Sequence, residues 1–188
     1  MDRREFCKLG VGTAAALGLG RLAIGAEETA APAKCDPDRL AAAAVKHFLP
    51  GKRTCGEAIM MAACEAMGIR SKLVPDVALG LSGGIGRQGD VCGVLCGAAL
   101  MVGIAAGRKF PKYVKKRQVT WDVTAKLYKD FQAKFGCVEC RKLCGLDLTK
   151  PEGMKALAAG VKKNKCGKVV DAAARMLAEA LQQVEKTA

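Results

Sequence analysis

Apolar residues recur at helical spacing along most of this chain, and no run alternates apolar and polar residues as a β-strand would. Capping residues and a proline in the first turn mark where helices begin. These patterns predict five helices, over residues 36–49, 55–67, 92–108, 114–135 and 166–185. The sequence therefore predicts an all-α fold, a single-domain helical bundle.

One of these helices is expected at the centre of the bundle. Residues 92–108 are apolar almost all round, which is typical of a buried helix, and a Gly-rich loop over residues 79–93 leads into it. In the 114–135 helix, apolar residues recur at helical spacing at Val114, Trp121, Ala125, Tyr128, Phe131 and Phe135. The last helix is predicted to bury Val169, Val170, Ala173, Leu177, Ala180, Leu181 and Val184.

The beginning of the chain, residues 1–26, has the pattern of a twin-arginine signal peptide. Arg3 and Arg4 precede Phe6 and a stretch rich in glycine and alanine, which is too interrupted to form a stable membrane span. This export route moves proteins that have already folded. The expected location is therefore the periplasm, and one expected partner is the twin-arginine export machinery.

Small residues predict that the signal is cleaved near Gly25 or Ala26. A polar linker is expected over residues 27–35, followed by a cysteine-rich helical redox domain over residues 36–188. The length of this second part suits one domain with a single sizeable core.

The chain is strongly basic, with a formal net charge of +13. A basic surface favours acidic partners. The lysine-rich runs over 112–117 and 162–168 have little aromatic interleaving, so no nucleic acid partner is expected. These runs are interpreted as solvated helix faces, with docking of an acidic redox protein partner as the alternative.

Cysteine is the compositional outlier, with ten residues in the chain. Cys7 lies in the predicted signal, which leaves nine in the exported part. A disulfide framework is the usual interpretation for an exported protein. Nine is an odd number, however, and a chain of this length that is rich in alanine does not need disulfides to fold. Metal ligation, reactive thiols and a mixture of the two remain open.

Several cysteines lie where a thiolate would be stabilised. Cys55, Cys92 and Cys166 are each at a predicted helix start, where free N–H groups and the positive end of the helix favour negative charge. Cys140 is expected in the short turn after the 114–135 helix. Four such sulfurs would form a four-ligand metal site if the fold brings them together.

Other cysteines leave the ligand set open. The C-x₂-C-x₃-C spacing of Cys137, Cys140 and Cys144 would place them on one helix face, and Cys96 lies one turn beyond Cys92. Cys64 is expected in the core. Cys35 is expected to be free or paired between chains, which leaves a homodimer open. No haem is expected, because Arg141 follows the C-x₂-C pair and His47 is the only histidine.

The glycine loop contains a literal G-x-G-x-x-G, formed by Gly84, Gly86 and Gly89. A dinucleotide site is not favoured, because the loop follows no convincing strand and no acidic residue occurs between Asp90 and Asp122. The better interpretation is that the loop delivers Cys92 to the central helix, with Asp90 as the helix cap, and that its backbone N–H groups approach sulfur. The cofactor-binding glycines predicted on this basis are Gly84, Gly86, Gly89 and Gly93.

From about residue 55 to residue 180 the chain resembles the family of redox-active proteins named for a C…C-G-A-x-x-G…C…C pattern. The resemblance rests on residues 83–97, with support from 135–143 and 166–170. Val94 stands where the pattern has alanine, and Cys96, Cys137 and Cys144 are additions, any of which could replace a ligand. The resemblance assigns the four family cysteines to Cys55, Cys92, Cys140 and Cys166. A similar domain in split-Soret type cytochromes is associated with an iron–sulfur centre.

These observations favour an exported electron-transfer or redox-sensing protein that binds an iron–sulfur cluster through Cys55, Cys92, Cys140 and Cys166. A [2Fe–2S] cluster is preferred, and zinc is less favoured. One alternative is a thiol–disulfide oxidoreductase, with Cys92 or Cys140 as attacking thiol and Cys96 or Cys137 as resolving thiol. Another is a helical metal-binding module without redox activity.

Overall fold

Five long helices form at the places that the periodic pattern predicts. The structure is a computed structural model of the chain, which describes residues 27–28, 35–50 and 52–188. The long helices are α2 (Pro37–Phe48), α3 (Cys55–Ala66), α4 (Gly93–Lys109), α5 (Tyr113–Phe135) and α8 (Gly167–Lys186). The predicted signal peptide, with its cleavage position, and most of the predicted linker lie outside the described residues.

The first two long helices begin at side-chain caps. The Asp36 carboxylate accepts a hydrogen bond from the Arg39 N–H at 2.8 Å, with Pro37 in the first turn. Thr54 and Glu57 form a capping box, in which the Thr54 N–H donates to the Glu57 carboxylate at 2.9 Å. The second cap fixes the start of α3, where Cys55 is the first helical residue.

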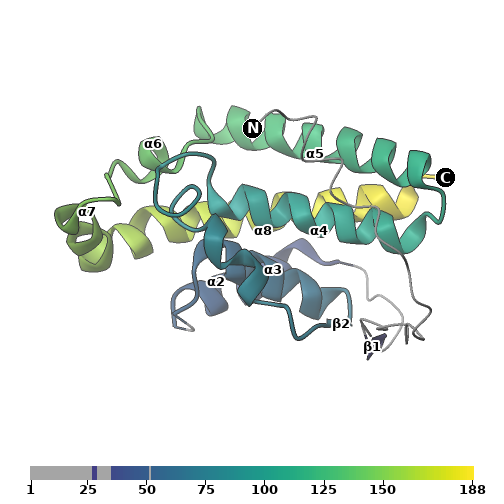
Figure 1. The fold of residues 1–188 in the computed structure, drawn as a ribbon, viewed down its shortest axis with the longest axis horizontal. Coiled ribbons are helices and arrows are strands. Elements are labelled where there is room, and N and C mark those ends of the chain that lie inside the picture. The colour runs from purple at the N-terminus through teal and green to yellow at the C-terminus, as the bar shows by residue number, and fades with distance from the viewer. Residues whose placement is uncertain (1–26, 29–34, 51) are drawn as a thin grey trace, which may run out of the picture.

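Helix α4 is the centre of the bundle, as its apolar composition predicts. It packs against α3, α5 and α8, while α2 packs against α3 and α8 (Figure 1). The apolar face predicted for α8 is buried in full. The all-α fold class is therefore confirmed. Among the described residues, no helix is both long and apolar enough to cross a membrane.

Helix α5 has its predicted bounds, but most of the apolar residues that recur from Val114 face outward. The buried seam is Val119, Val123, Leu127 and Phe131, at four-residue intervals. Val114, Trp121, Ala125 and Tyr128 are exposed. The side of α5 that packs on α4 and α8 is therefore not the side that carries most of the predicted apolar residues. Helix α5 has a second apolar face.

Short elements fill the rest of the described chain. They include the 3₁₀ helix η1 (Asp76–Leu81), α6 (Cys140–Cys144), α7 (Pro151–Ala156) and the π-helical segment η2 (Leu157–Cys166). Strands β1 (Glu27–Glu28) and β2 (Ile69–Arg70) form a two-residue antiparallel ladder. Elements α6, α7 and η2 lie at one end of the molecule (Figure 1), where they enclose the site described next.

Candidate functional site

The glycine-rich loop folds back on itself before α4. Gly83, Gly84 and Gly89 adopt positive φ angles of 69°, 71° and 83°, a region that glycine enters at little cost. Backbone bonds close the loop, with the Gly89 N–H donating to the Gly83 carbonyl at 3.0 Å. A Cβ on Gly84 would lie 2.3 Å from the Asp90 carbonyl oxygen, so the turn requires glycine at that position.

A short antiparallel bridge connects this loop to the segment before α6. Val91 pairs with Glu139. The Cys92 N–H donates to the Val138 carbonyl at 2.8 Å, and the Cys140 N–H donates to the Asp90 carbonyl at 2.7 Å. Cys92 and Cys140, which are far apart in the sequence, are therefore brought to the same site by backbone pairing.

Asp90 is not the cap of α4, contrary to the sequence-based prediction. Cys92 occupies the N-cap position with no side-chain cap. The Asp90 carboxylate instead accepts a hydrogen bond from the neighbouring Val91 N–H at 2.8 Å. The loop needs the Asp90 main chain for the bridge to Cys140, and this directs its side chain away from the helix start.

The beginnings of α3 and α4 touch at Gly93. A Cβ at this position would lie 2.6 Å from the Leu81 carbonyl oxygen and 2.9 Å from the Cys55 sulfur. Because Gly93 has no side chain, the first turns of the two helices approach closely and bring Cys55 and Cys92 near each other.

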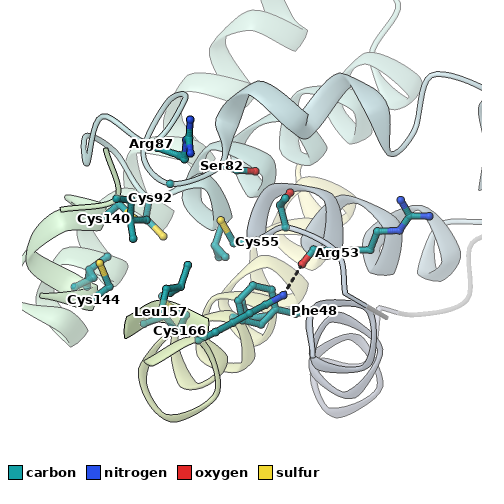
Figure 2. A pocket seen from close by; sticks show the side chains of 18 of the residues that line it. Phe48, Arg53, Cys55, Ser82, Arg87, Cys92, Cys140, Cys144, Leu157 and Cys166 are labelled. Carbon is teal, nitrogen blue, oxygen red and sulfur yellow. Dashed lines mark hydrogen bonds between the residues drawn. The ribbon is translucent and has the colours of Figure 1, made fainter. Parts of the chain in front are cut away.

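A single cavity of about 380 Å³ gathers the four predicted ligands. Its lining includes Cys55, Cys92, Cys140 and Cys166, and also a fifth cysteine, Cys144. In Figure 2, Cys92, Cys140 and Cys144 lie on one side of the cavity and Phe48 and Arg53 on the other, with Cys55 and Cys166 between them.

The other cysteines are absent from the lining of this cavity. Cys96 lies beside the backbone, with its sulfur 3.9 Å from the Val91 carbonyl oxygen. Cys137 precedes α6, so the three cysteines of the C-x₂-C-x₃-C run do not share one helix face. Cys64 is buried in the core, as predicted. The sequence feature that could have identified Cys144 as a lining residue is its position one helical turn after Cys140.

Two cysteines reach the cavity from places that differ from the prediction. Cys140 is the first residue of α6 and does not lie in an irregular turn. Cys166 ends the π-helical segment η2, which continues directly into α8. Its N–H group is therefore inside a helix, and Cys166 does not have the free helix start that Cys55 has.

The thiols of the cavity differ in acidity. A hydrogen bond from the Cys92 thiol, opposed by burial and assisted by the N–H groups of Gly83 and Gly56, lowers the pKa of Cys55 to about 7. The bond to Cys55 and burial raise the pKa of Cys92. Burial, followed by the charge of Cys144, raises the pKa of Cys140 to about 12 and that of Cys166 to about 11. Cys55 is thus the most acidic of these four thiols.

The remaining walls combine apolar side chains with cations. Lys52, Arg53, Arg87 and Lys162 are the charged residues of the lining, which includes no Asp, Glu or His. The Lys162 ammonium donates to the Arg53 carbonyl at 3.3 Å and lies 4.7 Å from the centre of the Phe48 ring. His47 pairs instead with Glu65 at 2.8 Å. These cations and the bonds to sulfur favour negative charge in the cavity.

The predicted glycines mostly shape the loop. Gly83, which was not among them, lines the cavity, and its N–H group helps to lower the pKa of Cys55. Cofactor contact by Gly84, Gly86, Gly89 and Gly93 stays a prediction. In the described part of the chain, no three His, Cys, Asp or Glu side chains are already placed to hold a single metal ion.

Comparison with known proteins agrees with this cysteine arrangement. A family model described as "Putative redox-active protein (C_GCAxxG_C_C)" matches residues 53–180. No curated protein and no solved structure matches the chain. The family name gives the central block as G-C-A-x-x-G, whereas the matched region of this chain has Cys92-Gly93-Val94-Leu95-Cys96-Gly97. The match covers most of the chain and all of the cavity lining except Phe48 and Lys52, so the protein belongs to the C_GCAxxG_C_C family of redox-active proteins.

Proposed function

We propose that this protein is an exported electron-transfer or redox-sensing protein that holds an iron–sulfur cluster. The ligands are Cys55, Cys92, Cys140 and Cys166, and [2Fe–2S] is the preferred cluster. The observation that carries the proposal is the convergence of these four cysteines, from α3, α4, α6 and the η2–α8 junction, on one cavity.

The chemistry of the cavity fits such a cluster. Its potential ligands are thiols alone, and thiolates are the ligands of iron–sulfur clusters and of many zinc sites. A volume of about 380 Å³ is within the range of small-molecule and cofactor sites. A zinc ion on the same thiolates is the alternative, and metal analysis distinguishes the two.

The protein's own groups have defined roles in this proposal. The N–H groups of Gly83 and Gly56 help to lower the pKa of Cys55, and the Val94 N–H group opposes the raised pKa of Cys92, so these N–H groups are positioned for N–H···S bonds to a thiolate. Such bonds stabilise charge on sulfur and adjust the reduction potential of a cluster. The apolar walls limit the access of water. A bound iron–sulfur cluster supplies uptake and release of single electrons.

The proposed export route agrees with this construction. The four cysteines meet only after α3, α4, α6 and α8 have packed, so a cluster on them requires a folded protein. A twin-arginine signal at Arg3 and Arg4 would carry a protein folded and loaded in the cytoplasm to the periplasm. An acidic redox protein is the proposed electron partner, given the net charge of +13.

Iron and acid-labile sulfide analysis of protein purified without oxygen tests the proposal. Iron and sulfide in stoichiometric amounts are expected. Serine variants of Cys55, Cys92, Cys140 and Cys166 are each expected to lose them. The matched controls are Cys35→Ser and Cys137→Ser, which lie outside the cavity lining and are expected to retain the cluster. Stoichiometric zinc without iron would overturn the proposal, and cluster loss in Cys144→Ser but not Cys140→Ser would reassign one ligand.

A second candidate function rests on the close approach of the helix starts that carry Cys55 and Cys92, and on the lowered pKa of Cys55. In a metal-free protein the Cys55 thiolate would attack one sulfur of a substrate disulfide and release the other as a thiolate. Cys92 would then give up its proton, attack the mixed disulfide and release the second thiolate, leaving a Cys55–Cys92 disulfide. This candidate therefore uses Cys55 as the attacking thiol and Cys92 as the resolving thiol, in place of the attack by Cys92 or Cys140 that the sequence favoured; the lowered pKa of Cys55 supports the change. This function predicts reduction of a model disulfide by metal-free protein, lost in Cys55→Ser.

A further inference from the structure

The outward face of α5 presents apolar and aromatic side chains to solvent. Tyr113 and Val114 are each 67% exposed, Trp121 is 58% exposed and Tyr128 is 39% exposed. Val114, Trp121 and Tyr128 follow one another at seven-residue intervals, which places them on one side of the helix. We call Tyr113, Val114, Trp121 and Tyr128 the outer stripe of α5.

The buried seam of α5 on α4 and α8 lies on the opposite side of the helix. It already accounts for the packing of α5 in the bundle through Val119, Val123, Leu127 and Phe131. Helix α5 runs along the edge of the molecule (Figure 1), and no other helix of the described chain lies outside it. The outer stripe is therefore a face that the packing of the described residues does not use.

Cations surround the first half of this stripe. Lys112, Lys115, Lys116 and Arg117 occur in or next to the first turns of α5, and no Asp or Glu lies between Phe110 and Trp121. The structure also places aromatic rings among these cations, which the sequence pattern had not indicated. The Arg117 guanidinium lies 4.8 Å from the Trp121 ring centre and 5.5 Å from that of Tyr113.

The charge and the size of the stripe decide between occupants. A second copy would bring two equally basic faces together, which like-charge repulsion disfavours. One helix face of about 22 Å by about 10 Å offers on the order of 200 Å². A stable protein interface needs about 800 Å² on each partner. A lipid surface has no such minimum, because each inserted side chain and each cation contributes by itself.

We propose that the outer stripe of α5 binds the surface of an anionic phospholipid membrane. Trp121 and Tyr113 enter the headgroup region, where amphipathic aromatic side chains are favoured. Lys112, Lys115 and Arg117 lie against the lipid phosphates. The protein would bind at the membrane surface, with α5 parallel to it. This proposal does not depend on the cluster.

The chain has a single tryptophan, so its fluorescence reports directly on this face. Purified protein is titrated with vesicles of phosphatidylglycerol and phosphatidylcholine in equal parts, and with phosphatidylcholine alone. The anionic vesicles are expected to shift Trp121 emission to the blue, and brominated lipid chains are expected to quench it. Added salt is expected to weaken the binding.

Charge variants test which lysines are involved. The double variant Lys112→Glu and Lys115→Glu is expected to weaken vesicle binding at least tenfold. The matched control is the double variant Lys150→Glu and Lys155→Glu. Both lysines are exposed at α7, at the other end of the molecule (Figure 1). This control is expected to bind vesicles as the wild type does. All variants begin at the same position of the sequence, so residues 1–26 contribute equally to each measurement.

Several results would overturn the proposal. Vesicle binding without a change in Trp121 emission would place the contact elsewhere in the chain. Equal binding to neutral vesicles would remove the role of the lysines. A Trp121 shift that depends on protein concentration without lipid would identify a second copy as the occupant. A shift with soluble poly-glutamate but not with anionic vesicles would identify an acidic polypeptide.

Discussion

Gly93 brings the first turns of α3 and α4 into contact at the cavity. An added Cβ would meet both the Leu81 carbonyl and the Cys55 sulfur. The absence of a side chain at this position is therefore what allows Cys55 and Cys92 to lie together. At the scale of single residues, the geometry of the thiols depends on this glycine as much as on the cysteines.

Gly93→Ala is expected to destabilise the protein by about 1–3 kcal/mol, because the methyl group forces the helix starts apart. It should also lower the iron content. Gly107→Ala in the same helix is the control, since a Cβ there meets nothing within 4 Å. That variant should gain about 0.5–1 kcal/mol from helix propensity. Urea unfolding measures both variants, and equal effects would show that the contact at Gly93 is unimportant.

At the scale of elements, the two faces of α5 are distinguished by burial. Phe131 is fully buried in the seam, and Tyr128 is on the outer stripe. Phe131→Ala is expected to cost about 3–5 kcal/mol of unfolding free energy, because it leaves a cavity in the core. Tyr128→Ala should cost no more than about 1 kcal/mol. Denaturant unfolding of the pair tests this orientation, which a larger loss in Tyr128→Ala would contradict.

The connection between α6 and α7 is fixed by Asp147. Its carboxylate accepts hydrogen bonds from the Thr149 hydroxyl at 2.6 Å and the Thr149 N–H at 3.1 Å, and it pairs with Arg141 at 2.8 Å. The Thr149 bonds, and then the Arg141 charge, lower the pKa of Asp147 to about 2. This carboxylate therefore stabilises the folded state when it is ionised.

The stability that Asp147 provides should depend on pH. Its pKa in the folded state is below the ordinary value of 3.8, so the contribution is complete above about pH 4 and is lost as the pH falls toward 2. Urea midpoints of the wild type and Asp147→Asn should differ by a constant amount at neutral pH. This difference should shrink in acid. A difference that does not change with pH would show that ionisation of Asp147 has no role.

The long helices could be predicted from the sequence because each repeats its periodic pattern over several turns. Helices α6 and α7 are too short to show a period, so they were not predicted. In α5 the exposed aromatic residues have helical spacing too, and only packing decides which face is buried. The helix start expected at Cys166 failed for a similar reason, because η2 continues into α8 without a break.

The candidate site could be predicted in part. Helix starts and family resemblance pointed to Cys55, Cys92, Cys140 and Cys166, and all four line the cavity. The Val91–Glu139 bridge that joins Cys92 to Cys140 could not be predicted, because one isolated pair leaves no repeating pattern in the sequence. Inclusion of Cys144 likewise depends on the direction of a helix of only five residues.

At the scale of the whole molecule, the proposed export of a folded protein agrees with a cavity that forms only on folding. The proposed ligands come from segments between Cys55 and Cys166, so the cavity exists only in the folded chain. The double variant Arg3→Lys and Arg4→Lys is expected to remain in the cytoplasm with its iron content unchanged. Cell fractionation with iron analysis measures this, and periplasmic protein in the double variant would contradict the twin-arginine assignment.

The most direct test of the proposed cluster is the visible absorption spectrum of protein purified without oxygen, before and after dithionite. A cluster on Cys55, Cys92, Cys140 and Cys166 predicts a broad visible absorbance that dithionite bleaches and reoxidation restores. The Cys35→Ser control should show the same spectrum, and Cys92→Ser should lack it. A colourless protein that contains zinc and no iron would contradict the proposed redox centre. A metal-free protein without a spectral change would contradict it as well.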